Sequence, residues 1–472
     1  MSLSTFLDRQ RIVAPANFNR WLVPPAALSI HLAIGQAYAF SVFNEPLTRV
    51  IGIDRHAPGD WELTTLGWTF SIAIVFLGLS AAVFGKWVER AGPRKVMLAS
   101  ACCFAGGFLV SALGVQLHQV ILLYLGYGVL GGIGLGLGYI SPVSTLIRWF
   151  PDRPGMATGL SIMGFGGGAM IGSPLGVALM GYFRSSTSTG VAETFVAMGL
   201  GYFVFMLFGA LIVRLPPPGW KPAGYVPSAR PRKLVTSANV SADEALKTPQ
   251  FYLLWAMLFL NVTAGIGVLG QASVMIREVF PSVKEAAAGG FVGLLSLFNM
   301  AGRFFWSSLS DYIGRKATYM VFFLLGAALY ALIPVAGEMG SIVLFVAGYA
   351  VILSMYGGGF ATIPAYLRDL FGTMQVGAIH GRLLTAWSAA GIAGPVLVNY
   401  IRAYQIDHAV AKARAYEVTM YIMAGLLILG AIFNFLVTPV HARHHYQEPA
   451  VTPPDGTKRK VSGATTAPAS WS

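Results

Sequence analysis

The sequence predicts an all-α membrane protein with twelve transmembrane helices in two six-helix bundles. The first observation is its composition, which is 55% hydrophobic and only 11% charged, whereas a soluble chain carries about 25% charged residues. The second is a series of apolar runs of about 20 residues, the length that crosses a bilayer core of roughly 30 Å as a helix. The third is an internal repeat between the two halves of the chain.

Twelve runs are apolar and long enough to span a bilayer. They lie near residues 22–43, 64–84, 96–115, 119–141, 155–182, 194–213, 250–275, 287–307, 317–336, 341–365, 378–400 and 417–439. The polar, proline-rich stretch PPPGWKPAGYVPSARPRK separates the sixth run from the seventh. We therefore expect a cytoplasmic N-terminal tail at 1–20, bundles at 21–214 and 250–440, a cytoplasmic linker at 215–249 and a disordered cytoplasmic tail at 441–472.

The distribution of charge predicts the orientation. Most of the 32 Lys and Arg residues fall on the side of the membrane that carries both termini, and short cytoplasmic loops hold such an excess. Both termini are therefore predicted to be cytoplasmic, in the plasma (inner) membrane. The net charge of +13 would suit nucleic acid only if it were gathered on one face. It is spread over many loops, so no nucleic-acid partner is expected.

Other classes of site are not indicated. Cys102 and Cys103 are adjacent in an apolar run, which excludes a disulfide framework and a cysteine metal site. We expect both to be core residues. No metal, cofactor or catalytic residue is predicted, and the chain is not expected to be an enzyme. The expected partners are the lipid bilayer and a small substrate, with a monomer as the functional unit.

Landmarks of the first half recur in the second at nearly one offset. The segment ERAG at 89–92 corresponds to DYIG at 311–314, and Pro142 corresponds to Pro364. Two six-helix halves in parallel topology are typical of transporters that bind substrate between the halves, near the bilayer midplane.

These segments also carry a family resemblance. The run GKWVERAGPRK at 85–95 resembles the loop 2–3 signature of the major facilitator superfamily, with Glu for the usual Asp and a Pro inserted before the Arg. The second copy, SSLSDYIGRK at 307–316, lacks the leading Gly and the first Arg. Segments 35–43, 138–159, 301–316 and 356–372 resemble the oxalate/formate antiporter family, a relative of the monocarboxylate transporters. The resemblance runs from about residue 20 to 440 and implies transport of small carboxylates.

Arg303 is the main candidate for a substrate ligand. It lies inside the eighth run, where a charge costs about 2.5 to 3.5 kcal/mol and marks a functional site. Ser296, Asn299, Arg303 and Ser307 form one polar stripe at helical spacing, which we expect to face the central cavity. A planar guanidinium can hold a carboxylate by two hydrogen bonds. The alternative is a structural ion pair, for which Asp311 is close enough in sequence.

The resemblance implies the same role for Arg303, because an Arg on this helix binds the carboxylate in both related groups. In the oxalate/formate antiporter family a Lys on helix 11 supplies a second cation, and Trp387 stands at that position here. A dianion held by one Arg would leave a buried charge uncompensated, so a monocarboxylate fits better than oxalate. Alternatively, Trp387 only packs and a protonated histidine supplies the second cation.

Two histidines and three aromatic residues complete the candidate site. His31 lies in the first span and His380 at the start of the eleventh. Because His titrates near pH 6.5, either could neutralise a second carboxylate or carry a coupling proton, although a structural hydrogen bond is the alternative for each. Tyr38, Tyr356 and Phe360 are expected to line the cavity, where hydroxyls and ring edges suit a carboxylate. For Phe360, ordinary packing is a competing interpretation.

The two signature segments are expected to form a conformational latch on the cytoplasmic side, with charges that pair with helix ends. Its predicted members are Gly85, Glu89, Arg90, Gly92, Arg94, Asp311, Gly314 and Arg315.

The function predicted from these features is secondary active transport of small carboxylates, such as oxalate, formate or lactate, by alternating access. The spans carry no Asp or Glu away from their ends, whereas proton-coupled transporters commonly use one, so anion exchange is favoured. Two alternatives remain. One is a proton-coupled monocarboxylate symporter that uses His31, and the other is a polytopic membrane receptor or enzyme. The short tail at 442–472 offers no soluble segment for the last alternative.

Overall fold

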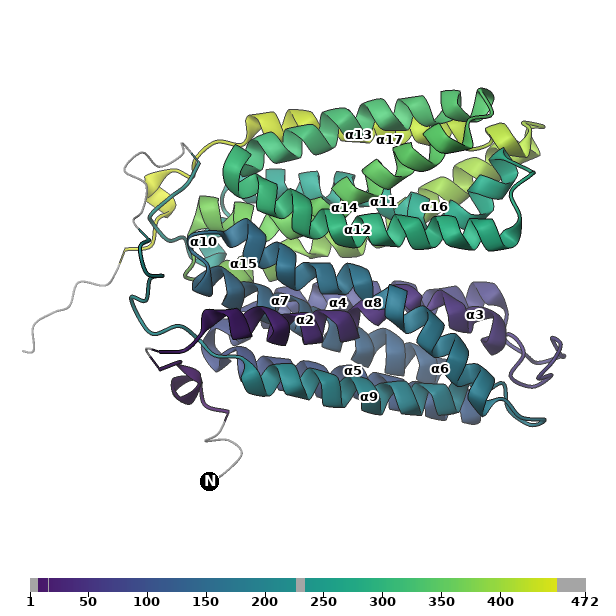
Figure 1. Ribbon diagram of the computed structural model, residues 1–472, viewed down its shortest axis with the longest axis horizontal. Coiled ribbons are helices and arrows are strands. Elements are labelled where there is room, and N and C mark those ends of the chain that lie inside the picture. The colour runs from purple at the N-terminus through teal and green to yellow at the C-terminus, as the bar shows by residue number, and fades with distance from the viewer. Residues whose placement is uncertain (1–6, 16, 226–233, 448–472) are drawn as a thin grey trace, which may run out of the picture.

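The computed structural model describes residues 7–15, 17–225 and 234–447. Within these residues the chain is a bundle of long helices (Figure 1). Eleven helices are long and apolar enough to cross a membrane, and a bent pair at Arg20–Ala39 and Ser41–Leu47 gives a twelfth span. The predicted fold class is therefore confirmed. Most of the tail predicted to be disordered, from residue 448 onward, lies outside the described residues.

The helices of the first half, here called the N-half, occupy the lower layer of Figure 1. Their bounds are α2 (Val23–Ile34) with the 3-10 segment η3 (Gly35–Ala39), α3 (Ser41–Leu47), α4 (Leu63–Ala91), α5 (Pro93–Gln116), α6 (Val120–Leu123) with the π-helical segment η4 (Tyr124–Gly131), α7 (Gly132–Trp149), α8 (Pro154–Phe183) and α9 (Val191–Ile212).

The second half, here called the C-half, forms the upper layer of Figure 1. After the short helix α10 (Ala242–Ala245), its bounds are α11 (Pro249–Val279), α12 (Glu285–Ile313), α13 (Arg315–Glu338), α14 (Ile342–Phe371), α15 (Val376–Leu383), α16 (Thr385–Asp407), the 3-10 turn η5 (Lys412–Arg414) and α17 (Glu417–Leu436). The N-terminal segment, α10 and the described end of the chain all lie at one end of the bundle, on the left of Figure 1. We call this the linker end.

A bend interrupts the first span where it crosses α8. The two backbones meet at Gly35 and Gly168, and a Cβ on Gly35 would lie 2.8 Å from the Cα of Phe165. Only glycine permits such an approach. The chain tightens to 3-10 geometry over η3 and then turns by 45° into α3, and η3 carries Tyr38 at this turn.

Glycine also ends the two repeated helices at the linker end. Gly92 closes α4 with φ of +84° and Gly314 closes α12 with φ of +92°, a backbone region that other residues rarely adopt. Each glycine lets the next helix, α5 or α13, start at once. The internal repeat is therefore a repeat of backbone geometry as well as of sequence.

The expectation for the two cysteines is wrong. Cys102 is exposed and Cys103 is only partly buried. They lie on the face of α5 that points away from the bundle, because α5 packs α7 and α9 with its other side. An apolar residue on such a face suits contact with lipid rather than with a protein core.

Candidate functional site

Arg303 is fully buried at the contact between the two halves. Its Nε donates to Asn299 Oδ1 at 3.1 Å on the same helix, α12, and one terminal nitrogen donates to the carbonyl of Ile162 on α8 at 3.3 Å. No ion pair to Arg303 is found within the described part of the chain. Asp311, the alternative partner, bonds Arg315 and the start of α8 instead. The positive charge is therefore buried without a compensating carboxylate.

Aromatic rings from both halves surround this guanidinium. Its carbon lies 5.7 Å from the ring centre of Phe165 on α8 and 5.3 Å from that of Phe360 on α14. Trp387 on α16 packs against both rings, with centroids 5.2 Å and 4.5 Å away. The hydroxyl groups of Tyr38 and Tyr356 meet across the halves at 3.3 Å. The structure thus brings together the predicted aromatic residues and Arg303.

A second group of rings extends from this cluster toward the linker end. Tyr139 on α7 lies 5.3 Å from Trp387, 5.3 Å from His31 and 5.8 Å from His380, measured between ring centroids. All four side chains are buried. Tyr139 therefore connects the rings beside Arg303 with the two histidines, one from each half.

Several buried polar atoms of this cluster have no hydrogen-bond partner among the described residues. They are one terminal nitrogen of Arg303, Nε1 of Trp387, the hydroxyl of Tyr139, Nε2 of His31 and both ring nitrogens of His380. An unsatisfied buried donor costs about 1 to 3 kcal/mol, and more if it is charged. Such a group of unpaired polar atoms is rare in a packed interior. It suits a site that binds a polar or anionic molecule.

The remaining polar positions of the predicted stripe face other neighbours. The Ser307 hydroxyl donates to the Arg303 carbonyl and lies against Gly159 of α8, while Ser296 is only partly buried. Ser307 therefore belongs to the contact between α12 and α8 rather than to the cluster.

Two members of the cluster, Tyr139 and Phe165, were missed by the sequence argument. Tyr139 follows the glycine run at 132–138 and Phe165 precedes another at 166–168, so each lies beside a stretch of small residues and not in a polar stripe. The glycines allow close helix contact. A single large ring beside such a run is the signal that could have identified them.

The predicted latch residues lie at the linker end, where the halves make reciprocal contacts. Glu89, near the end of α4, is paired with Arg148 of α7 in its own half. Its other oxygen accepts from the backbone N–H of Gly377 at 3.0 Å, in the first turn of α15. A carboxylate at a helix N-terminus is stabilised by the free N–H groups and the helix dipole, so Glu89 joins the halves.

Asp311 makes the corresponding contact in the opposite direction. Its two oxygens accept from the N–H groups of Gly155 and Met156 in the first turn of α8, both at 2.9 Å. Arg315 holds Asp311 at 2.6 Å and also reaches Asp369 at 3.2 Å. The offset that relates Glu89 to Asp311 also relates Gly155 to Gly377. The repeat thus produces two matching contacts, each from one half to the other.

The other predicted latch residues have different neighbours. Arg94 donates to the carbonyls of Leu211 at 3.1 Å and Val213 at 3.4 Å, at the end of α9, so it ties helices within the N-half. Lys316, its counterpart in the repeat, caps the end of α17 in the same way. Arg90 is exposed.

Gly85 lies at a direct contact between the halves. A Cβ there would lie 2.7 Å from the Cα of Ala378 on α15. The close approach of α4 and α15 therefore requires glycine at this position.

The linker helix α10 bridges the halves at the same end. Asp243 accepts from Lys86 of α4 at 2.6 Å and from Arg382 of α15 at 2.7 Å. The hydrogen bonds from Lys86 and then Arg382 lower the pKa of Asp243 to about 2. The carboxylate consequently stays ionised, and its contribution is present above its ordinary pKa and is lost only as the pH falls through about 2.

Removing the charge of Asp311 should open the linker end. Asp311→Asn weakens two bonds to α8 and the pair with Arg315, and charge-assisted bonds of this kind contribute about 1.5 to 3 kcal/mol. We expect a cysteine introduced at Thr158, which now bonds the Ala361 carbonyl across the halves at 2.7 Å, to react with a maleimide at least about tenfold faster in this background.

The control for that experiment is Asp54→Asn, which removes a surface ion pair with Arg184 elsewhere in the N-half. This change should leave the labelling rate of the Thr158→Cys protein as it was. Equal acceleration by both substitutions, or none by Asp311→Asn, would contradict a latch at Asp311.

Comparison with known proteins identifies a family and several relatives that share this architecture. The profile of the Major Facilitator Superfamily matches residues 16–395 and 282–471. The chain is 28% identical over 378 residues to the oxalate:formate antiporter of Oxalobacter formigenes, covering 80% of this chain and 83% of that one. It is 24% identical over 435 residues to human monocarboxylate transporter 11, covering 89% and 83%.

A solved structure shares the fold. The fucose:proton symporter of E. coli superposes with a TM-score of 0.62 over 88% of this chain and 99% of its own, at 14% identity. The profile match spans most of the sequence and the helical architecture agrees, so the chain belongs to the major facilitator superfamily.

Proposed function

We propose that this protein is a secondary active transporter that exchanges small organic carboxylates by alternating access between its two halves. The observation that carries the proposal is Arg303, a buried cation at the contact of the halves with an unused donor and no acidic partner among the described residues. A carboxylate would supply both the missing charge and the missing acceptor. The relative whose name includes oxalate and formate supports the substrate class.

The surroundings of Arg303 favour a monocarboxylate. Phe165 and Phe360 lie beside the cation, and Trp387 packs against both of these rings. The described structure places no second permanent cation beside Arg303. A dianion would keep one charge buried without a partner, which costs several kcal/mol. Formate or lactate is therefore the proposed substrate class, ahead of oxalate.

The charge distribution supports an orientation with the linker end and both termini in the cytoplasm. The proposed location is the plasma membrane, and the proposed functional unit is a monomer. The latch at Glu89 and Asp311 then closes the cytoplasmic side. The site is proposed to open to that side when these contacts break, because both carboxylates bind helices of the opposite half.

The test uses purified protein in liposomes. Vesicles loaded with unlabelled formate or lactate should take up labelled formate without a pH gradient, and empty vesicles should take up little. Accumulation that follows an imposed pH gradient and ignores the internal anion would reject exchange. No uptake of any carboxylate in a panel would reject the substrate class.

Proton-coupled symport is the second candidate, and the contacts of His31 favour it. Nδ1 lies 3.2 Å from the Ala27 carbonyl and 3.0 Å from the Ser161 hydroxyl. A carbonyl can only accept, so neutral His31 carries its proton on Nδ1, and Nε2 is left as a base without a partner among the described residues.

His31→Gln tests this second candidate. Glutamine keeps a donor but cannot take up a proton. If His31 carries the coupling proton, the variant should lose uptake driven by a pH gradient and retain exchange of labelled for unlabelled formate. Gradient-driven uptake that survives the substitution would exclude His31 as the coupling group.

A further inference from the structure

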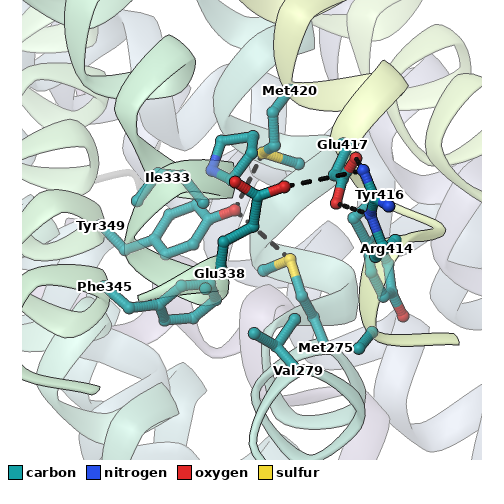
Figure 2. A pocket seen from close by; sticks show the side chains of 13 residues that line it. Met275, Val279, Ile333, Glu338, Phe345, Tyr349, Arg414, Tyr416, Glu417 and Met420 are labelled. Carbon is teal, nitrogen blue, oxygen red and sulfur yellow. Dashed lines mark hydrogen bonds and ion pairs between the residues drawn. The ribbon is translucent and has the colours of Figure 1, made fainter. Parts of the chain in front are cut away.

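A separate cavity lies inside the C-half, away from the linker end. Its volume is about 280 Å³, and its walls come from α11, α13, α14, η5 and α17 (Figure 2). This is slightly below the usual range of small-molecule pockets, about 300 to 1,000 Å³. No element of the N-half lines it, so it is distinct from the cluster around Arg303.

The inner part of the cavity is apolar, and its methionine side chains can adapt their shape. Met275, Ile333, Phe345 and Met420 line it and are all buried. Figure 2 shows the Tyr349 hydroxyl between the two methionine sulfur atoms, to which it donates at 3.3 Å and 2.9 Å. Thioethers are weak acceptors and adapt to the shape of aromatic and alkyl groups. This end of the cavity suits a small hydrocarbon or aromatic body.

The mouth of the cavity is ionic, and its carboxylates exceed its cations. Arg414 binds Glu417 through two nitrogens, at 2.7 Å and 3.2 Å. Arg414 also forms an ion pair with Glu338 at 3.6 Å, which is longer than a hydrogen bond. The two carboxylates therefore share one cation. Glu338, whose side chain is 57% exposed, accepts no hydrogen bond from Arg414 and keeps acceptor capacity at the opening.

Glu278 does not line the cavity, but it contacts the wall residue Tyr416 and its charge is already satisfied. Glu278 accepts from Arg402 Nε at 3.0 Å and from the Tyr416 hydroxyl at 2.7 Å. This network closes the side of the cavity without directing a free charge into it. The cavity therefore offers a ligand an apolar inner part and one carboxylate acceptor, Glu338, at the mouth.

We propose that this cavity binds a small organic ammonium compound, with its apolar body between Met275 and Met420 and its ammonium group at Glu338. Aromatic rings and methionines provide the contact area, and the carboxylate excess at the mouth selects a cation over an anion. All contacts lie within one half, so binding does not compete with a carboxylate at Arg303. The proposal is therefore independent of the proposed transport function.

The test measures binding of 2-phenylethylammonium to the full-length protein in lipid nanodiscs by calorimetry, with uncharged 2-phenylethanol as the matched probe. The amine should bind more tightly than the alcohol, by about fivefold, the discrimination expected from one partly exposed charge pair. Saturating formate should leave the amine affinity unchanged. Equal affinity for the two probes would overturn the assigned ligand class.

Two variants localise the site. Glu338→Gln should remove the preference for the amine and leave the alcohol unaffected, and Met420→Trp should abolish binding of both by filling the cavity. If Met420→Trp does not fold, Val279→Phe fills the same space from α11. Binding of the amine that persists in a folded cavity-filling variant, or that is lost when Arg303 is replaced by Gln, would overturn the proposal.

Discussion

Replacing Arg303 by glutamine is expected to lower carboxylate uptake by at least about a hundredfold. The guanidinium is completely buried, and its nearest ring contacts are Phe165 and Phe360. Without it, a bound carboxylate would be a buried charge with no partner, which costs about 3 to 5 kcal/mol. The measurement is the initial rate of labelled formate uptake into liposomes that contain unlabelled formate.

Arg303→Lys separates charge from geometry. Lysine keeps the positive charge but not the planar fork that can hold two carboxylate oxygens, so we expect a loss of about tenfold. Arg184→Gln is the matched control, because Arg184 is an exposed arginine that pairs with Asp54. Full activity in Arg303→Lys would show that Arg303 does not bind the carboxylate through both oxygens.

The fold was largely predictable because the bilayer imposes a length on every span. Apolar runs predicted twelve spans, and the described structure has eleven helices long and apolar enough to cross a membrane, or twelve with the bent first pair. The helix ends were less accurate. The second span was predicted at 64–84, but α4 continues to Ala91. A hydropathy window stops at the first polar residues, whereas the helix continues because Gly85 and Glu89 contact α15.

The bend in the first span could not be predicted from its own residues. It depends on the close approach of Gly35 to α8, a contact between segments that are far apart in the sequence. The internal repeat, in contrast, was informative at the level of sequence. Its nearly constant offset related Asp311 to Glu89, although the pairing of each with the start of a helix in the other half is visible only in three dimensions.

The candidate site was predictable where a residue was chemically unusual for its surroundings. Arg303 is a charge in an apolar run, and Trp387 replaces a cation that the resemblance implies. Tyr139 and Phe165 were not predictable in this way, because aromatic residues are common in membrane helices and only packing decides which of them face the centre. The roles of all these residues in transport remain a proposal, which substitution can test.

Trp387→Lys is expected to change the substrate preference from monocarboxylate toward oxalate. Trp387 is fully buried against Phe360 and Phe165, and its Nε1 has no partner among the described residues. A lysine there would place a second cation beside Arg303. The ratio of oxalate to formate uptake should rise by about tenfold or more, since pairing a second buried charge is worth at least about 1.4 kcal/mol.

Trp387→Met is the control that separates the effect of an added charge from the effect of a larger site. Both substitutions remove the indole ring and enlarge the site, but only lysine adds a cation. The ratio of labelled oxalate to labelled formate uptake should therefore rise for lysine and stay near the original value for methionine. An equal rise in both variants would mean that the ring excludes oxalate by its size, and no rise in either would refute the argument from the missing cation.

The lysine variant also predicts a pH dependence with a definite sign. Two cations in one buried site repel each other, so an empty site favours a neutral lysine. A bound dianion supplies the second negative charge and draws a proton onto the lysine. Oxalate uptake by Trp387→Lys should therefore increase as the pH falls, while formate uptake, which needs only Arg303, should change much less over the same range.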